Sequence, residues 1–213
     1  MSNNRVVETI SLFRSQLQHR RFDDETLRIL ESLLISKDVK SLLEMRSCLR
    51  DFMRSESVYV LKELLEKPVD QKLTVLEFFV RAFALVADVE SCLALKYEAL
   101  VLRERTSVSR EWLRVSKEEW FGFAKDSLHN GFYSIVVKGC DNALSCTQLA
   151  DAEINLKIKK LKDIAVNLVA SHSGWDRFPI KGKFEPNLGE ISCFMLLLVR
   201  MVCHLQLDTL LDI

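Results

Sequence analysis

The run Trp120-Phe121-Gly122-Phe123-Ala124 and the turn His129-Asn130-Gly131 that follows it decide the fold class of this chain. Apolar residues recur at helical spacing before the turn, and the same spacing resumes after it. Asn and Gly tolerate backbone conformations that interrupt a helix, so this triplet is a natural corner. The stretch therefore predicts two helices joined by a tight turn. The second helix contains Tyr133, Cys140, Ala143 and Leu144.

This helix pair resembles one tetratricopeptide unit. A large residue, Trp120, opens its first helix, an aromatic, Tyr133, opens the second, and Ala143-Leu144 closes it. Helix pairs of this kind stack and hold peptides or partner proteins rather than perform bond chemistry. A degenerate second copy ends at Ala99-Leu100, which is farther from Ala143 than the repeat length of about 34 residues. A regular array is therefore excluded, and residues 105–115 are predicted to be a longer linker.

Composition restricts the class of protein. The chain has 213 residues and equal numbers of basic and acidic residues, 30 of each, so no overall charge draws it to nucleic acid or to a membrane. Its six cysteines show no zinc-ligand spacing and are expected to be reduced. The N-terminus lacks a signal-peptide pattern, and the apolar run Ile191–Val199 is shorter than the roughly twenty residues that span a bilayer. We expect a soluble, intracellular protein that does not contact a membrane.

Helical periodicity dominates the remaining sequence, and Gly and Pro are scarce. It predicts an all-α fold of roughly nine or ten helices, stacked as antiparallel pairs in a tetratricopeptide-like, α-solenoid-like single domain over residues 1–213. The apolar helix over 70–87 is expected at its centre. Other helices are predicted at 6–18, after Asp23-Asp24, after Asp38, at 58–66 (behind Ser55 or Ser57 and before Pro68), after Asp88 to Arg105, after the capping box Ser116–Glu119, at 149–170 and at 188–207.

No residue pattern in the chain indicates an enzyme. The four histidines are far apart in sequence, and neighbouring Cys203 and His204 would diverge on one helix. No phosphate-binding Gly loop or metal-ligand motif occurs. We therefore expect no catalytic residue, cofactor, metal or small-molecule ligand.

Candidate partner-binding residues fall in two regions. Residues 171–187 form a predicted irregular loop that contains Trp175, Phe178 and Phe184; a loop of this length is often functional, and its aromatics suit either core packing or docking of a partner. The linker region carries Arg103, Arg105, Arg110 and Arg114. These arginines, with a second basic cluster at Lys157, Lys159, Lys160 and Lys162, fit a solvated helix face, or a weak contact to nucleic acid or an acidic peptide.

Several segments together resemble a family of plant meiotic proteins called DOUBLE-STRAND BREAK FORMATION. They are Arg20-Arg-Phe-Asp-Asp-Glu25, the following Thr26–Leu42, His129–Tyr133 and Asp141–Cys146. The resemblance implies a nuclear, non-enzymatic accessory factor for the programmed DNA breaks that start meiotic recombination. Such a factor would act beside the topoisomerase-like break-forming complex, and no functional residue of the family is carried over to this chain.

Three functions follow from these observations. The first is a scaffold that binds protein components of the meiotic break-forming machinery. The second is an adaptor that contacts DNA directly through its basic residues, which the balanced charge does not favour. The third is a cytoplasmic helical-repeat adaptor unrelated to meiosis.

Overall fold

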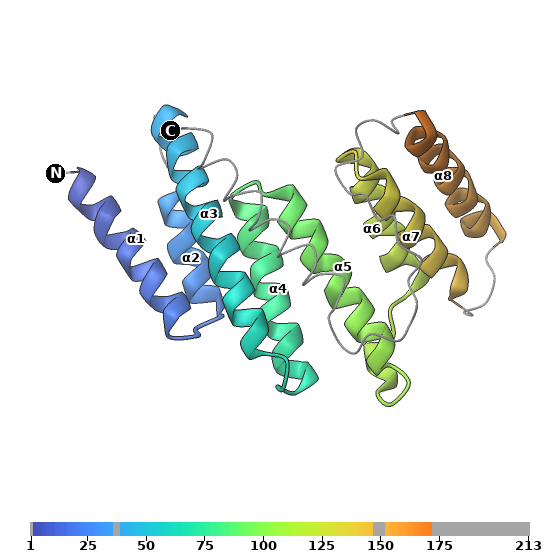
Figure 1. Ribbon diagram of the computed structural model, residues 1–213, viewed down its shortest axis with the longest axis horizontal. Coiled ribbons are helices and arrows are strands. Elements are labelled where there is room, and N and C mark those ends of the chain that lie inside the picture. Colours follow the sequence, from blue (N-terminus) through green and yellow to red (C-terminus); the bar gives the residue numbers. More distant parts are fainter. Residues whose placement is uncertain (1, 36–38, 147–151, 172–213) are drawn as a thin grey trace. The chain divides into compact units, whose positions relative to one another are not determined.

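The computed structural model describes residues 2–35, 39–146 and 152–171, and every regular element in these ranges is helical (Figure 1). The all-α prediction is thus confirmed for the described part of the chain. The described residues fall into two compact units, one ending at Leu102 and the other beginning at Arg103. The tetratricopeptide-like stacking and the single domain over 1–213 stay predictions. The elements are α1 (Ser2–Gln18), α2 (Asp24–Leu33), α3 (Val39–Glu63), α4 (Val69–Leu85), α5 (Val89–Thr106), the 3-10 turn η1 (Glu111–Leu113), α6 (Lys117–His129), α7 (Tyr133–Ser145) and α8 (Ala152–Ser171).

The core of the first unit is built around α4, as its all-round apolar sequence predicts. α1 packs on α2, and both α2 and α3 pack on α4 (Figure 1). Phe79 of α4 is fully buried, and the rings of Phe22 and Phe78 meet it at centre-to-centre distances of 5.7 and 5.4 Å. Such tilted and edge-on contacts add to the stabilisation that burial of the rings provides.

Asp23 caps the N-terminus of α2, as predicted. Its Oδ1 accepts hydrogen bonds from the backbone N of Thr26 at 2.8 Å and from the Thr26 hydroxyl at 2.9 Å. These two bonds lower the pKa of the Asp23 carboxyl, because they stabilise its charged form. The apolar face that follows is buried at Leu27, Leu30 and Leu33, which fixes α2 against the core.

The predicted break at Ser55 or Ser57 is wrong, since α3 runs without interruption from Val39 to Glu63. Ser57 does not cap a new helix. It is fully buried, and its hydroxyl donates to the backbone oxygen of Arg54 one turn earlier, at 2.9 Å. No Gly or Pro lies within these residues to stop the helix, and a serine in mid-helix satisfies its hydroxyl in this way.

Asp88 precedes α5 as predicted and also anchors α3. Its carboxylate accepts the Ser91 hydroxyl at 2.7 Å, while Arg54 Nε and Nη2 donate to its two oxygens at 2.7 and 2.8 Å. The Asp88 side chain is only 2% exposed. A buried carboxylate of this kind is stable because hydrogen bonds and a cation compensate its charge.

The second unit contains the predicted helix pair, followed by α8. α6 packs on α7, and α7 packs on α8 (Figure 1). Gly131 makes the corner between α6 and α7 with φ +80°, a left-handed conformation that Gly adopts without steric cost. Trp120 and Phe123 are buried in contact with each other, so Trp120 is a packing residue. Ile158 and Ala165 are the buried residues of α8.

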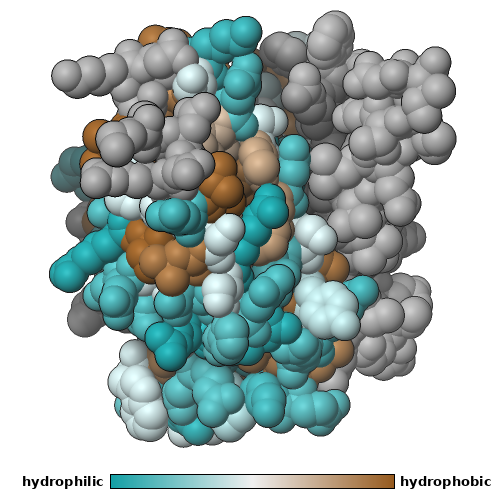
Figure 2. Space-filling model, turned by 90° about the vertical axis from the view of Figure 1, so that its left-hand side faces the viewer, coloured by the Kyte–Doolittle hydropathy of each residue, from teal (hydrophilic) through white to brown (hydrophobic). Residues whose placement is uncertain are grey.

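Two sequence predictions lie outside the described residues. They are the aromatic loop, of which only Ser171 is described, and the helix at 188–207. Among the described helices, none is long and apolar enough to cross a membrane. The side of the molecule on which α1 lies shows apolar residues among mostly hydrophilic ones (Figure 2), and Val7 and Leu12 of α1 are exposed.

Candidate protein-binding site at the α5–α6 connection

The connection from Ser107 to Ser116 holds two of the four arginines that the sequence singles out, and it ends in a well-defined helix cap. The Ser116 hydroxyl accepts the backbone N–H of Glu119 at 3.1 Å, and Glu119 Oε2 accepts the backbone N–H of Ser116 at 2.9 Å. This is the predicted capping box, in which each residue satisfies a backbone donor of the other. The beginning of α6 is therefore fixed, and with it the end of the connection.

Arg103 joins the last turn of α5 to this cap. Its Nη1 and Nη2 donate to the two carboxylate oxygens of Glu119 at 2.6 and 3.3 Å, and Nη2 also reaches the backbone oxygen of Arg114 at 3.4 Å. Burial raises the pKa of the Glu119 carboxyl, but the hydrogen bonds from Arg103 and Ser116 outweigh burial and leave the pKa lowered. The Arg103 guanidinium is thus already engaged within the protein.

Of the other three arginines, Arg105 and Arg114 are exposed and Arg110 is partly buried. Arg105 is an exposed residue in the last turn of α5. Arg114 is about half exposed, and its Nη2 lies 3.7 Å from Glu111 Oε1. The guanidinium carbon of Arg110 lies 6.0 Å from the centre of the Trp112 ring. A cation over the face of an indole ring is attracted by the electrons of the ring, so this contact restricts both side chains.

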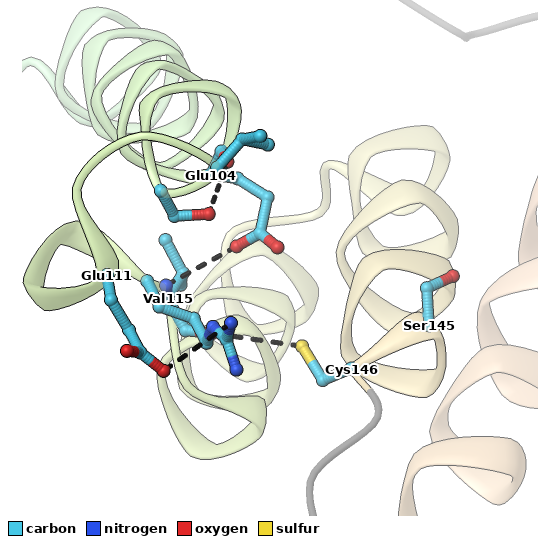
Figure 3. A pocket seen from close by; sticks show the side chains of 8 residues that line it. Glu104, Glu111, Val115, Ser145 and Cys146 are labelled. Atoms are coloured by element: carbon cyan, nitrogen blue, oxygen red, sulfur yellow. Dashed lines mark hydrogen bonds and ion pairs between the residues drawn. The ribbon is translucent and has the colours of Figure 1, made fainter.

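A hollow of about 380 Å³ lies beside the connection (Figure 3). Val115 is one of the residues that line it. The backbone N–H of Val115 donates to Glu104 Oε2 at 3.3 Å, and the Cys146 thiol lies 3.8 Å from the backbone oxygen of Val115. The hollow is thus formed by the end of α5, the connection and the end of α7. Its lining residues are Glu104, Ser107, Val108, Glu111, Arg114, Val115, Ser145 and Cys146.

Neither Cys146, which lines this hollow, nor Cys140 of α7 is an activated thiol. Burial is the largest influence on Cys146 and raises its pKa, and the nearby Glu104 carboxylate raises it further. Burial likewise raises the pKa of Cys140, to about 11. A thiol with a raised pKa stays protonated at neutral pH, and the thiolate is the reactive form. In the part of the chain that the structure describes, no group of His, Cys, Asp and Glu is arranged to hold a metal ion.

Two large apolar side chains stand at the rim of the hollow and in the adjoining turn. Val108 is 94% exposed, and Trp112, on η1, is 75% exposed. Tryptophan and arginine are both enriched among the few residues that carry most of the binding energy at protein interfaces. The arrangement suits a partner that offers an apolar side chain flanked by acidic residues.

The structure brings together only part of what the sequence singled out. Lys117, a further basic residue directly after the connection, is buried and donates to Asn155 Oδ1 of α8 at 3.0 Å, so it links α6 to α8 and is not part of a basic surface. Trp175, Phe178 and Phe184 lie outside the described residues. Sequence reasoning missed Ser145 and Cys146 at the hollow. Their position directly after the predicted closing pair Ala143-Leu144 was the available signal.

Comparison with known proteins gives one informative relative. The chain is 48% identical over 187 residues to the Arabidopsis thaliana protein named "Protein DOUBLE-STRAND BREAK FORMATION", and the match covers 81% of this chain and 79% of the relative. No protein-family model matches the chain, and no solved structure matches it. The resemblance that the sequence segments indicated is confirmed.

Proposed function

Because this chain belongs to the DOUBLE-STRAND BREAK FORMATION family, we propose that it acts in the nucleus in the formation of meiotic DNA double-strand breaks. Its role is that of a non-catalytic accessory protein that binds protein components of the break-forming machinery. The observation that carries this proposal is the 48% identity to a protein named for this process, over four fifths of the chain. The all-helical fold is compatible with such a role, because helix pairs of this type commonly serve as binding scaffolds.

The tetratricopeptide-like pair is the scaffold in this proposal. Gly139 of α7 lets the two helices approach closely: a Cβ at this position would lie 3.2 Å from Ala124 Cβ and 3.2 Å from Phe123 Cδ1 of α6. The pair holds the α5–α6 connection through the capping box and through Cys146. The connection is therefore presented from a firmly packed support, and a site on a rigid support loses little entropy on binding.

The partner contact in this proposal is the exposed Trp112, with Arg110 beside it and Arg105 and Arg114 in the same region. A protein segment with one large apolar side chain and nearby Asp or Glu residues meets both features. Direct DNA contact is the second candidate. It is supported by the exposed Lys159 and Lys160 on α8, whereas Lys157 and Lys162 are paired with Glu153 and Asp141 at 2.6 Å each.

The test is recovery of break-machinery proteins with the tagged chain from meiotic cells. The wild type, Trp112→Ala and, as a matched control, Tyr59→Ala are compared at equal abundance; Tyr59 is also an exposed aromatic (66%) but lies in α3. We expect Trp112→Ala to recover at least about tenfold less of the partner, since loss of a central aromatic commonly costs 2 kcal/mol or more, roughly thirtyfold in affinity. Tyr59→Ala should behave as the wild type.

Two outcomes contradict the proposal. If the wild type recovers no component of the break-forming machinery, the protein does not act by binding these proteins. A steeply salt-dependent shift of duplex DNA by the purified chain, lost when Lys159 and Lys160 are changed to Gln, moves the assignment to the DNA-binding adaptor.

A further inference from the structure

The N-terminal half of α3 carries a face on which, among the described residues, two apolar side chains are exposed and two arginines are partly buried. Val39, Leu43, Arg46 and Arg50 follow one another at spacings of four, three and four residues, so they lie along one stripe of the helix. We call these four residues the α3 face. Val39 is 68% exposed and Leu43 is 59% exposed, although apolar residues at such spacing usually point into a core.

The same stripe is buried farther along the helix. Met53 and Ser57 continue it at spacings of three and four, and both are fully buried. The stripe therefore begins as an exposed surface and becomes part of the core of the first unit. An α3 face continuous with a packing surface is suited to receive a further helix, because the ridges and grooves of side chains continue without a break.

The charges of the α3 face lack acidic partners among the described residues. Arg46 Nε is buried and has no hydrogen-bond partner, and Arg50 donates only to the Ser47 hydroxyl, at 3.3 Å. One turn onward, by contrast, Arg54 is bound by both oxygens of Asp88. A buried donor with no partner is unusual in native proteins, and a guanidinium is most strongly satisfied by a carboxylate.

We propose that the α3 face binds an amphipathic helix of another protein, one that carries Asp or Glu within two turns of apolar side chains. The apolar residues of that helix cover Val39 and Leu43, and its carboxylates pair with Arg46 and Arg50. This is recognition of a helix by a helix surface, with anchors spaced three or four residues apart. The inference goes beyond the proposed function, since it concerns the other unit and holds whether or not Trp112 binds a partner.

A second copy of the chain is a poor occupant of this face. Two antiparallel copies of α3 would place arginine against Val39 or Leu43 and would bring no carboxylate to the stripe. The nearby Glu44 points away from it by about 100° relative to Leu43 and lies 4.0 Å from Lys40. Charge complementarity therefore favours an acidic partner over self-association.

The test uses the full-length protein and a designed probe. The probe is a fluorescent, helix-stapled peptide of about 15 residues, the length at which an isolated helix becomes marginally stable. It carries two Leu four residues apart near one end and two Glu four residues apart near the other, and a second peptide has Gln in place of both Glu. We expect saturable binding of the Glu peptide by fluorescence anisotropy, and binding of the Gln peptide about tenfold weaker.

Variants of the chain complete the test. Arg46→Gln with Arg50→Gln should weaken binding of the Glu peptide about tenfold and remove the difference between the two peptides. Leu43→Ser should weaken both peptides equally. Lys40→Gln is the matched control, since Lys40 is an exposed cation of the same helix off the stripe, and it should leave both affinities unchanged. Thermal unfolding of each variant by circular dichroism verifies that it is folded.

Four outcomes overturn the proposal. Equal affinity for the Glu and Gln peptides would show that the α3 face does not recognise acidic residues. An undiminished affinity of the Arg46→Gln, Arg50→Gln variant for the Glu peptide would show that these two arginines do not bind it. Absence of peptide binding together with a lower melting temperature of Leu43→Ser shows that the chain covers this face itself. A dimer in light scattering that Leu43→Ser dissociates assigns the face to a second copy.

Discussion

The α6–α7 pair and the connection before it use tryptophan in opposite ways. Trp120 is 1% exposed and packs against Phe123, whereas Trp112 is 75% exposed and contacts Arg110. The first residue stabilises the fold, and the second is available to a partner. The difference shows that residue type alone does not identify a binding residue, because burial decides which role an aromatic has.

The largest expected effect separates these two residues. Trp120→Ala should lower the free energy of unfolding by about 3–5 kcal/mol, because it leaves a large cavity between α6 and α7. Trp112→Ala should change it by less than about 0.5 kcal/mol, as is usual for an exposed position. Urea unfolding followed by circular dichroism measures both. A similar loss of unfolding free energy in the two variants would contradict the different roles of Trp120 and Trp112.

The close approach of α6 and α7 gives the next effect. Gly139→Leu should destabilise the chain by about 1–3 kcal/mol, because the added side chain is forced against Ala124 and Phe123. Gly122→Leu is the matched control. It lies on α6, where a Cβ would meet nothing within 4 Å, and Leu is a better helix former than Gly, so this variant should not lose stability. A similar loss in Gly122→Leu would show that the close approach at Gly139 is not the cause.

The helix cap at Ser116, where the connection meets α6, contributes less to the free energy of unfolding. Ser116→Ala removes the acceptor for the Glu119 backbone N–H and should cost about 1 kcal/mol. Ser116→Asp retains an acceptor and should restore most of the loss. Thermal unfolding measures both variants against the wild type. Equal melting temperatures of Ser116→Ala and the wild type would show that the Ser116 hydroxyl contributes nothing to stability.

The smallest effect depends on pH. The folded pKa of Glu119 is lowered below its ordinary value of 4.5, so the folded state stabilises the carboxylate. That stabilisation is present above pH 4.5 and is lost as the pH falls through the folded pKa. The melting temperature of the wild type should thus exceed that of Glu119→Gln at pH 7, and the gap should shrink toward pH 3.5. A gap that widens in acid would contradict the role of Arg103.

Local features of the fold could be predicted, whereas features that depend on distant residues could not. The caps at Asp23, Asp88 and Ser116 and the corner at Gly131 follow from residues within one turn of each other. The continuous α3 was missed, because Ser57 resembles a cap until its burial is known. The Arg54–Asp88 pair joins residues far apart in sequence, and only the structure reveals it.

The candidate site was predictable in the same partial way. The arginines of the connection were identified from their type and spacing, but their roles depend on neighbours that the sequence does not give. Arg103 is held by Glu119, while Arg110 lies over Trp112. The hollow also needs Cys146, which reaches the backbone oxygen of Val115 only because the end of α7 lies beside the connection.

The central claim is that the exposed Trp112, and not the stability of the fold, connects this chain to break formation. The most direct measurement is the number of meiotic breaks, counted as recombinase foci in meiotic cells that lack the native protein and express Trp112→Ala or the wild type at equal abundance. The account predicts clearly fewer foci with Trp112→Ala than with the wild type. Equal numbers of foci at equal protein abundance would contradict it.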